Sequence, residues 1–72
     1  MSIKIVGVGV MKQFSTELAV ANIAVSDLAE KLGMPQDLAD ELIVVRGHRK
    51  LNEEELIHDG DEVHVLHLIS GG

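Results

Sequence analysis

The sequence predicts a single small α+β domain, in which one main helix packs on one face of a mixed β-sheet. Segments rich in β-branched residues lie near both ends of the 72-residue chain, and an amphipathic helical stretch lies between them. A half-buried sheet and one amphipathic helix bury their apolar faces most simply against each other. The length allows one domain, which we expect over residues 1–68, with a flexible tail at 69–72.

The first third of the chain predicts a β-hairpin. Residues 3–11 are rich in Ile and Val and lack proline, which is typical of a strand. Gly7 and Gly9 blur its alternation, so a bulge is expected there. Residues 12–15 are polar enough for a connection, and residues 16–20 predict the second strand.

The middle of the chain predicts the main helix. Ser26 and Asp27 are favourable N-cap residues at its start. An apolar stripe of helical period follows, formed by Val25, Leu28, Ala29 and Leu32. Gly33 and Pro35 predict its end, and residues 35–40 allow one further short turn of helix.

The last third predicts three more strands. They are expected at residues 42–46, 49–51 and 62–68. Gly47-His48 predicts a tight turn, residues 52–56 an acidic loop or single helical turn, and Asp59-Gly60-Asp61 another turn. The resulting order is β-β-α-β-β-β. The right-handed crossover rule then favours a last strand beside the first, as in a β-grasp fold.

Composition and charge exclude several classes of protein. The chain has 12 acidic and 6 basic residues and one aromatic residue, Phe14, so we expect no nucleic-acid partner. It has no cysteine, which excludes disulfides, Cys-based zinc sites and a thiol nucleophile. We identify no membrane span or targeting segment and expect a soluble, cytoplasmic protein without a membrane partner.

No catalytic constellation is visible, so we expect a protein that is not itself an enzyme. The serines have no motif context, and the Gly7-x-Gly9 stretch lacks the third glycine of a phosphate-binding loop. The four histidines are His48, His58, His64 and His67. His64 and His67 are three residues apart on a strand and point to opposite faces. We therefore expect neither a metal site nor a stably bound cofactor.

Gly71 and Gly72 are the most informative residues. A tail without Cβ atoms can thread through a narrow channel, and the Gly72 carboxylate has no side chain to obstruct its activation as an acyl-adenylate. The alternative is an incidental Gly-Gly end, because chain ends are often irregular and rich in glycine.

Residues 59–72 closely resemble the end of the ubiquitin-like sulfur-carrier family of the ThiS and MoaD type. The shared pattern is an acidic-Gly-Asp turn, a hydrophobic strand and a terminal Gly-Gly. The resemblance extends to residues 43–48, to the helix at 27–32 and to the chain length, and it departs from the family at Gly7 and Gly9. It implies a ubiquitin-like β-grasp fold.

The resemblance also implies a function. An adenylyltransferase of the ubiquitin-activating type would use ATP to adenylate Gly72, and a sulfur donor would convert the adenylate into a thiocarboxylate. The sulfur would pass to a sulfur-accepting synthase or target in thiamine, molybdopterin or tRNA-thiolation pathways, while Gly71 keeps the tail slim. One alternative is a ubiquitin-like modifier joined to lysines through Gly72. The other is a β-grasp interaction module without C-terminal chemistry.

A docking surface is predicted on the open face of the sheet. If Ile43, Val45, Val63 and Val65 face the helix, aliphatic residues remain for the open face or the tail. With the tail residues that follow, the tentative partner-binding set is Val44, Leu66, Leu68, Ile69 and Ser70. A basic partner could also meet the acidic residues Glu53, Glu54, Glu55, Asp59, Asp61 and Glu62, which otherwise serve as a solvated loop.

Overall fold

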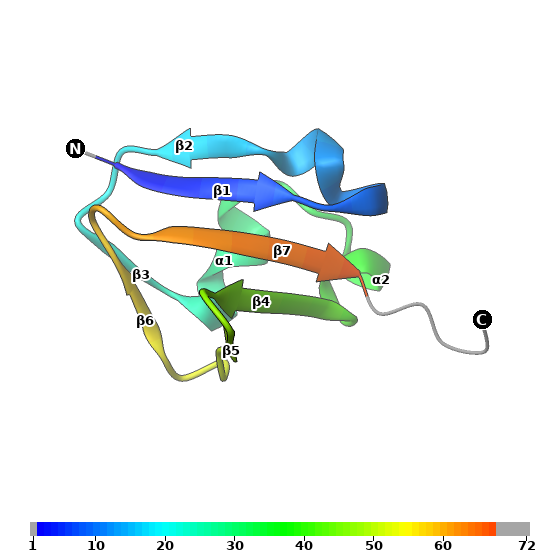
Figure 1. Cartoon of the computed structure of the whole chain (residues 1–72). Coiled ribbons are helices and arrows are strands. Elements are labelled where there is room, and N and C mark those ends of the chain that lie inside the picture. Colours follow the sequence, from blue (N-terminus) through cyan, green and yellow to red (C-terminus); the bar gives the residue numbers. More distant parts are fainter. Residues whose placement is uncertain (1, 68–72) are drawn as a thin grey trace.

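The computed structural model describes residues 2–67, which form an α+β domain around a mixed five-stranded sheet (Figure 1). The strand order is β2-β1-β7-β4-β5, and a separate two-stranded sheet pairs β3 with β6. The elements are β1 (Ile3–Gly7), the 3-10 helix η1 (Gly9–Phe14), β2 (Thr16–Leu18), β3 (Asn22–Ala24), α1 (Val25–Lys31), α2 (Gln36–Ala39), β4 (Leu42–Arg46), β5 (Arg49–Lys50), β6 (Leu56–His58) and β7 (Glu62–His67).

The last strand, β7, is the centre of the main sheet. It runs parallel to β1, with Val63 beside Ile5, and antiparallel to β4, with Val65 opposite Val44. The prediction that the last strand lies beside the first is therefore confirmed. A crossover that includes α1 connects the hairpin β1–β2 to the strands on the other side of β7.

The core lies between the main sheet and α1, which crosses behind the sheet in Figure 1. Alternation along the strands puts every second side chain on this side. The most deeply buried aliphatic residues are Ile3, Ile5, Leu28, Val44, Ile57, Val63 and Val65, each at most 2% exposed. Since the core draws on β1, β4, β7, α1 and β6, the two sheets and the helix bury one continuous apolar volume.

The predicted main helix forms, but its N-cap is different from the expected one. α1 begins at Val25 after Ala24, and no side chain caps it, so the expected caps Ser26 and Asp27 lie inside the helix. The N–H groups of Val25 and Ser26 donate instead to the carbonyls of Glu55 and Glu53, at 3.0 and 3.1 Å. A neighbouring loop thus satisfies the donors that a capping side chain would otherwise satisfy.

The two helices end as the sequence indicates. Gly33, with φ 70°, follows α1, and the N–H of Met34 donates to the carbonyl of Ala29 at 2.9 Å. The short turn expected at 35–40 is α2. No helix within residues 2–67 is long and apolar enough to cross a membrane.

The first strand is shorter than predicted, and the hairpin connection is helical. β1 ends at Gly7 rather than continuing to residue 11, and residues 9–14 form η1 instead of part strand, part polar turn. Met11, on η1, is fully buried. The N–H of Gly7 donates to the Ser15 hydroxyl at 2.8 Å, which closes the segment. The blurred alternation thus marked the end of the strand.

The two-stranded sheet was absent from the prediction. β3 and β6 have three residues each and pair antiparallel, with Ile23 opposite Ile57. Each strand contributes one central apolar side chain to the interior, and a single apolar residue gives no periodicity to detect. Residues 49–50 form the expected return strand, β5, and the acidic segment after it is an irregular turn that ends in β6.

Gly7 provides a test of the way η1 folds back on β1. A Cβ on Gly7 would lie 1.8 Å from the Met11 carbonyl oxygen, so Gly7→Ala forces the backbone of η1 to move. We expect a loss of about 2–4 kcal/mol in unfolding free energy, measured by urea denaturation.

The control is Gly9→Ala. Gly9 has φ 60° with open space around its Cβ position, so only the conformational cost of about 1–2 kcal/mol applies. Equal losses for the two variants would contradict the close approach at Gly7.

Candidate functional site: the open sheet face and the end of β7

The residues predicted to be chemically activated, Gly71 and Gly72, follow the C-terminal end of β7 in sequence. His67 is the last residue of this strand, and it is followed in sequence by the Gly-Gly segment. The predicted site residues Leu68, Ile69, Ser70, Gly71 and Gly72, and the predicted domain boundary at 68/69, lie outside the described residues. The structure therefore describes β7, the strand that precedes this segment in sequence.

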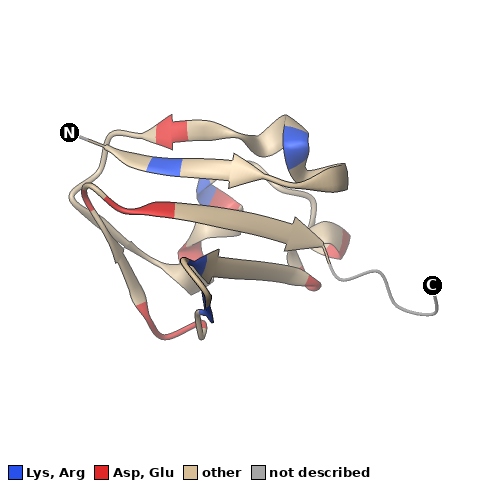
Figure 2. Cartoon of the chain, viewed as in Figure 1, with Lys and Arg blue, Asp and Glu red and all other residues tan. Residues whose placement is uncertain are grey.

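The face of the main sheet opposite α1 is not covered by any helix of residues 2–67 (Figure 1). At the start of β7 this face is charged: Lys4 lies between Glu17 on β2 and Glu62 on β7, with the Lys4 and Glu62 side chains 3.9 Å apart. Figure 2 shows that the charged segments of β1 and β7 lie near the start of β7 and that the rest of these two strands is uncharged.

An apolar surface occupies the rest of this face. We define the open-face patch as Val6, Ile43, Val45, His64 and Leu66. All five are half-buried, and the pairing brings them together: Ile43 lies opposite Leu66, while His64 lies between Val6 and Val45. The patch thus forms a continuous, mainly aliphatic area on three adjacent strands.

The exposed aliphatic side chain of Val8 adjoins the patch. Val8 continues the extended backbone beyond β1, and its N–H donates to the Val65 carbonyl at 3.0 Å. By alternation its side chain is on the same side as Val6. It is 44% exposed, and Val10 on η1 is 54% exposed.

The placement of Val44 on the open face was wrong. Val44 is 2% exposed and lies opposite Val65 on the core side. Directly opposite residues in an antiparallel pair share a face, so Ile43 and Val45, predicted to face the helix, belong to the open-face patch instead. Leu66 lies on the open face as predicted.

The register between β4 and β7 is the signal that would have corrected this assignment. The β4 sequence Leu-Ile-Val-Val-Arg is apolar at its first four positions, so its own pattern does not distinguish the two faces. Val6 was missed because Gly7 and Gly9 obscured the alternation of β1.

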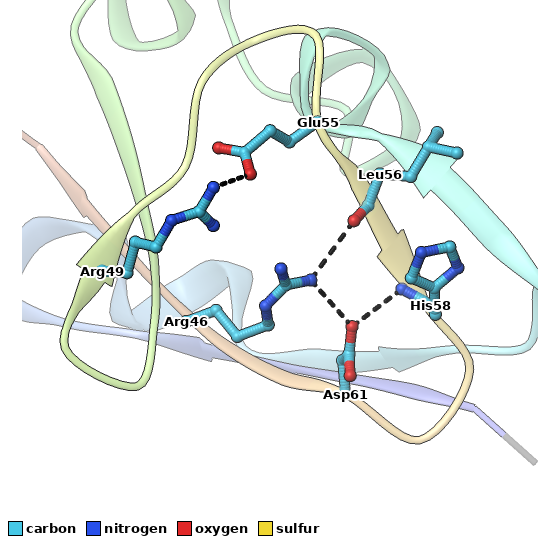
Figure 3. A network of polar contacts seen from close by, with 6 residues as sticks. All are labelled: Arg46, Arg49, Glu55, Leu56, His58 and Asp61. Carbon is cyan, nitrogen blue, oxygen red and sulfur yellow. Dashed lines mark hydrogen bonds and ion pairs between the residues drawn. The ribbon is translucent and has the colours of Figure 1, made fainter.

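Arg46 connects the main sheet to β6 and to the turn before β7 (Figure 3). Its Nη1 donates to the Leu56 carbonyl at 3.2 Å and to Asp61 Oδ2 at 3.1 Å. The His58 N–H donates to the same carboxylate oxygen at 2.9 Å. The His58 N–H, and secondarily the Arg46 guanidinium, hold the pKa of Asp61 below its usual value of 3.8.

A second acidic residue, Glu55, is also paired within the chain. Its carboxylate accepts from the Asn52 N–H at 2.7 Å and contacts Arg49. The Asn52 N–H, followed by Arg49, lowers the pKa of Glu55. With Glu62, which lies 3.9 Å from Lys4, three of the six acidic residues proposed for a basic partner therefore already have partners inside the molecule. Glu53 and Glu54 are exposed beside them.

The histidines are separated in space. His64 is on the open face and His67 on the core side, as the three-residue spacing predicted. His67 Nε2 lies 3.0 Å from Glu41 Oε2. His48 and His58 are exposed in or beside turns. Among residues 2–67, no three His, Asp or Glu side chains are grouped so as to hold a metal ion.

Comparison of the chain with protein-family models found no match, and comparison with curated proteins found none. The functional interpretation therefore depends on the residues of this chain. The relevant features are the central position of β7, the open-face patch beside its end and the glycines that follow in sequence.

Asp61→Asn tests the network around Arg46. The substitution removes the charge that Arg46 and the His58 N–H recognise, and we expect it to lower the unfolding free energy at pH 7 by about 1–2 kcal/mol. Asp37→Asn, at an exposed site on α2, is the control and should change stability by less than about 0.5 kcal/mol.

The same variant has a defined pH dependence. Because the pKa of Asp61 is lower in the folded protein, its stabilising effect is complete above the unfolded value of 3.8 and is lost as pH falls through the folded value. Urea denaturation at a series of pH values should show the wild-type advantage shrinking below about pH 4. An advantage that stays constant down to pH 2 would contradict the assignment.

Proposed function

We propose that this chain is a sulfur-carrier protein with a β-grasp fold, whose Gly72 carboxylate is adenylated and then converted into a thiocarboxylate. The observation that carries the proposal is the position of β7: the central strand, held between β1 and β4, continues in sequence directly to Gly71 and Gly72. From Glu62 to Val65 the strand has a neighbour on each side, and β4 continues the pairing to His67, which fixes the position of the strand that precedes the two glycines in sequence. The proposal requires a free α-carboxylate on Gly72 in the mature protein.

The arrangement of the sheet supports a β-grasp assignment. An antiparallel hairpin at the N-terminus, a helix across one face and a last strand parallel to the first are the elements that the sequence predicted for this fold. The Asp59-Gly60-Asp61 turn of the family resemblance sits before β7, where Asp61 binds Arg46. The motif thus has a structural role that positions the start of the strand.

The chemistry uses the main-chain terminus and needs no catalytic side chain of this protein. The Gly72 carboxylate attacks the α-phosphorus of ATP on the partner adenylyltransferase, pyrophosphate leaves, and an acyl-adenylate forms. Hydrosulfide supplied by the sulfur donor then attacks the carbonyl carbon, AMP leaves, and loss of the S–H proton gives the thiocarboxylate. Because the chain has no cysteine, the terminal carboxyl group is the position at which it could carry a transferable sulfur.

The open-face patch supports docking to a partner protein. It presents aliphatic side chains on β7 and on the strands on either side of it, from the middle of β7 at His64 to Leu66. Protein interfaces draw their affinity from buried apolar contacts surrounded by polar groups. The charged row around Lys4 and Glu62 borders the patch on one side.

The test of the carrier function is the intact mass of the protein. The full chain is incubated with an adenylyltransferase of the ubiquitin-activating type from its own host, ATP and a sulfur donor. We expect its mass to rise by the difference between one sulfur and one oxygen atom. Omission of ATP, or a chain lacking Gly71 and Gly72, should abolish the change.

Other outcomes distinguish the alternatives. A ladder of larger conjugates on a blot of the tagged protein in its host, without thiocarboxylate, would favour a lysine modifier. No mass change with the cognate enzyme, combined with full function after deletion of Gly71 and Gly72, would leave an interaction module and overturn the proposal.

Leu66→Asp tests the docking role of the open-face patch. A charge in the centre of an apolar interface should raise the KM for adenylation about tenfold or more, while the circular dichroism spectrum stays unchanged. The control is Leu56→Asp on β6, an aliphatic side chain that is 45% exposed and outside the patch. Equal effects of the two substitutions would contradict a specific docking surface.

A further inference from the structure

The outer edge of β2 carries main-chain groups that point away from the sheet. β2 is the last strand on its side of the five-stranded sheet, at the top of Figure 1. The Lys4 N–H donates to the Asp61 carbonyl at 3.0 Å, so the main-chain groups of Lys4 face β7. Because Lys4 lies opposite Glu17, the N–H and carbonyl of Glu17 face outward, and no other main-chain hydrogen bond within residues 2–67 involves them. An edge of this kind can pair with a further strand.

A cavity of about 350 Å³ lies beside this edge, between β2 and the end of α1. Its apolar lining consists of Phe14 at the end of η1, Leu18 on β2 and Leu32 after α1, all half-buried. Leu18 lies opposite the buried Ile3, so its side chain is on the side of the sheet that faces α1. The cavity is therefore on the opposite side of the sheet from the open-face patch.

The polar lining of this cavity favours a carboxylate. Lys31 is its one charged residue among those the structure describes, and the amide of Gln13 and the hydroxyl of Ser15 line it as well. The Ser15 hydroxyl oxygen accepts from the Gly7 N–H, which leaves its proton free to donate. Within residues 2–67 Lys31 makes no ion pair, not even with Asp27 one turn earlier on α1.

A second cavity, of about 430 Å³, continues the groove along α1 and shares Lys31 with the first. Val20 and Ile23, both half-buried, give it an apolar part, while Asp27 and Glu30 also line it. These two carboxylates would repel an acidic side chain. The second cavity therefore suits an aliphatic side chain, and the first suits an acidic one.

We propose that the β2 edge and this groove bind an extended segment of a partner protein, which adds an antiparallel strand to β2 and inserts an aliphatic and an acidic side chain into the two cavities. In such complexes main-chain hydrogen bonds provide affinity, and pockets for alternate side chains provide specificity. Alternate residues of a strand are about 7 Å apart and point to the same side. The inference does not depend on the carrier function, because it uses neither the open-face patch nor the terminal glycines.

A second copy of the chain fits this edge less well. If two β2 strands paired antiparallel around Glu17, the two Glu17 side chains would lie directly opposite each other. Like charges in that position destabilise a strand pair. A segment of another protein without an acidic residue opposite Glu17 avoids this repulsion.

The test is an NMR titration of the isotope-labelled full chain with a synthetic peptide, acetyl-Thr-Val-Thr-Val-Thr-Asp-Thr-amide. Its alternation places two valines and one aspartate on one face of a strand. We expect amide shift changes in β2 and at Lys31 and Leu32, together with slower hydrogen exchange of the Glu17 N–H. A peptide with lysine in place of the aspartate should bind about three- to tenfold more weakly, as for the loss and reversal of one exposed ion pair.

A charge reversal in the protein makes the test specific. Lys31→Glu should reverse the preference, so that the lysine peptide binds more tightly than the aspartate peptide. The matched control is Lys50→Glu on β5, at the opposite edge of the sheet, which changes the net charge equally and should keep the wild-type preference. Both lysines are exposed, so neither substitution alters the core.

Three results would overturn the proposal. The first is an absence of shift changes in β2 at saturating peptide. The second is a preference between the two peptides that Lys31→Glu and Lys50→Glu change to the same extent. The third is a dimer in sedimentation analysis of the peptide-free protein, with slow exchange of the Glu17 N–H that depends on protein concentration, because a second copy would then occupy the edge.

Discussion

The pairing of β7 between β1 and β4 is the constraint on which the rest of the structure depends. It brings the last strand of the chain into the middle of the sheet, with Val63 and Val65 fully buried. Because side chains alternate, burying these two residues requires Glu62, His64 and Leu66 to face the other way. A shift of one residue in this register would exchange the core side and the open face.

Three further features accompany that register. Val44 lies opposite Val65 and joins the core, which leaves Ile43 and Val45 for the open-face patch. At the start of β7, Asp61 accepts from both Arg46 and the His58 N–H, so that the strand, β4 and β6 are held in one network. At its other end, His67 meets Glu41. The same strand therefore links the core, the exposed surface and the base of the Gly-Gly segment.

Much of this arrangement could be predicted from the sequence. The strand at 42–46, the turn at 59–61 and the amphipathic stripe of α1 have strong local signals, and the crossover rule correctly paired the last strand with the first. The cap of α1 could not be predicted, because carbonyls of Glu53 and Glu55 from a distant loop replace a side-chain cap. The side of the sheet on which Val44 lies could not be predicted either. β4 is apolar on both faces, and only its pairing with β7 determines which of its residues are buried.

The carrier proposal is tested most directly by the C-terminal peptide of the protein isolated from its native host. After proteolysis, mass spectrometry of the peptide that contains Gly71 and Gly72 identifies the group on its last carbonyl. The account predicts a peptide that ends at Gly72, part of it as the thiocarboxylate, with the sulfur lost on alkaline hydrolysis. A peptide that continues beyond Gly72, or one found only as the carboxylate under conditions of active sulfur transfer, would contradict it.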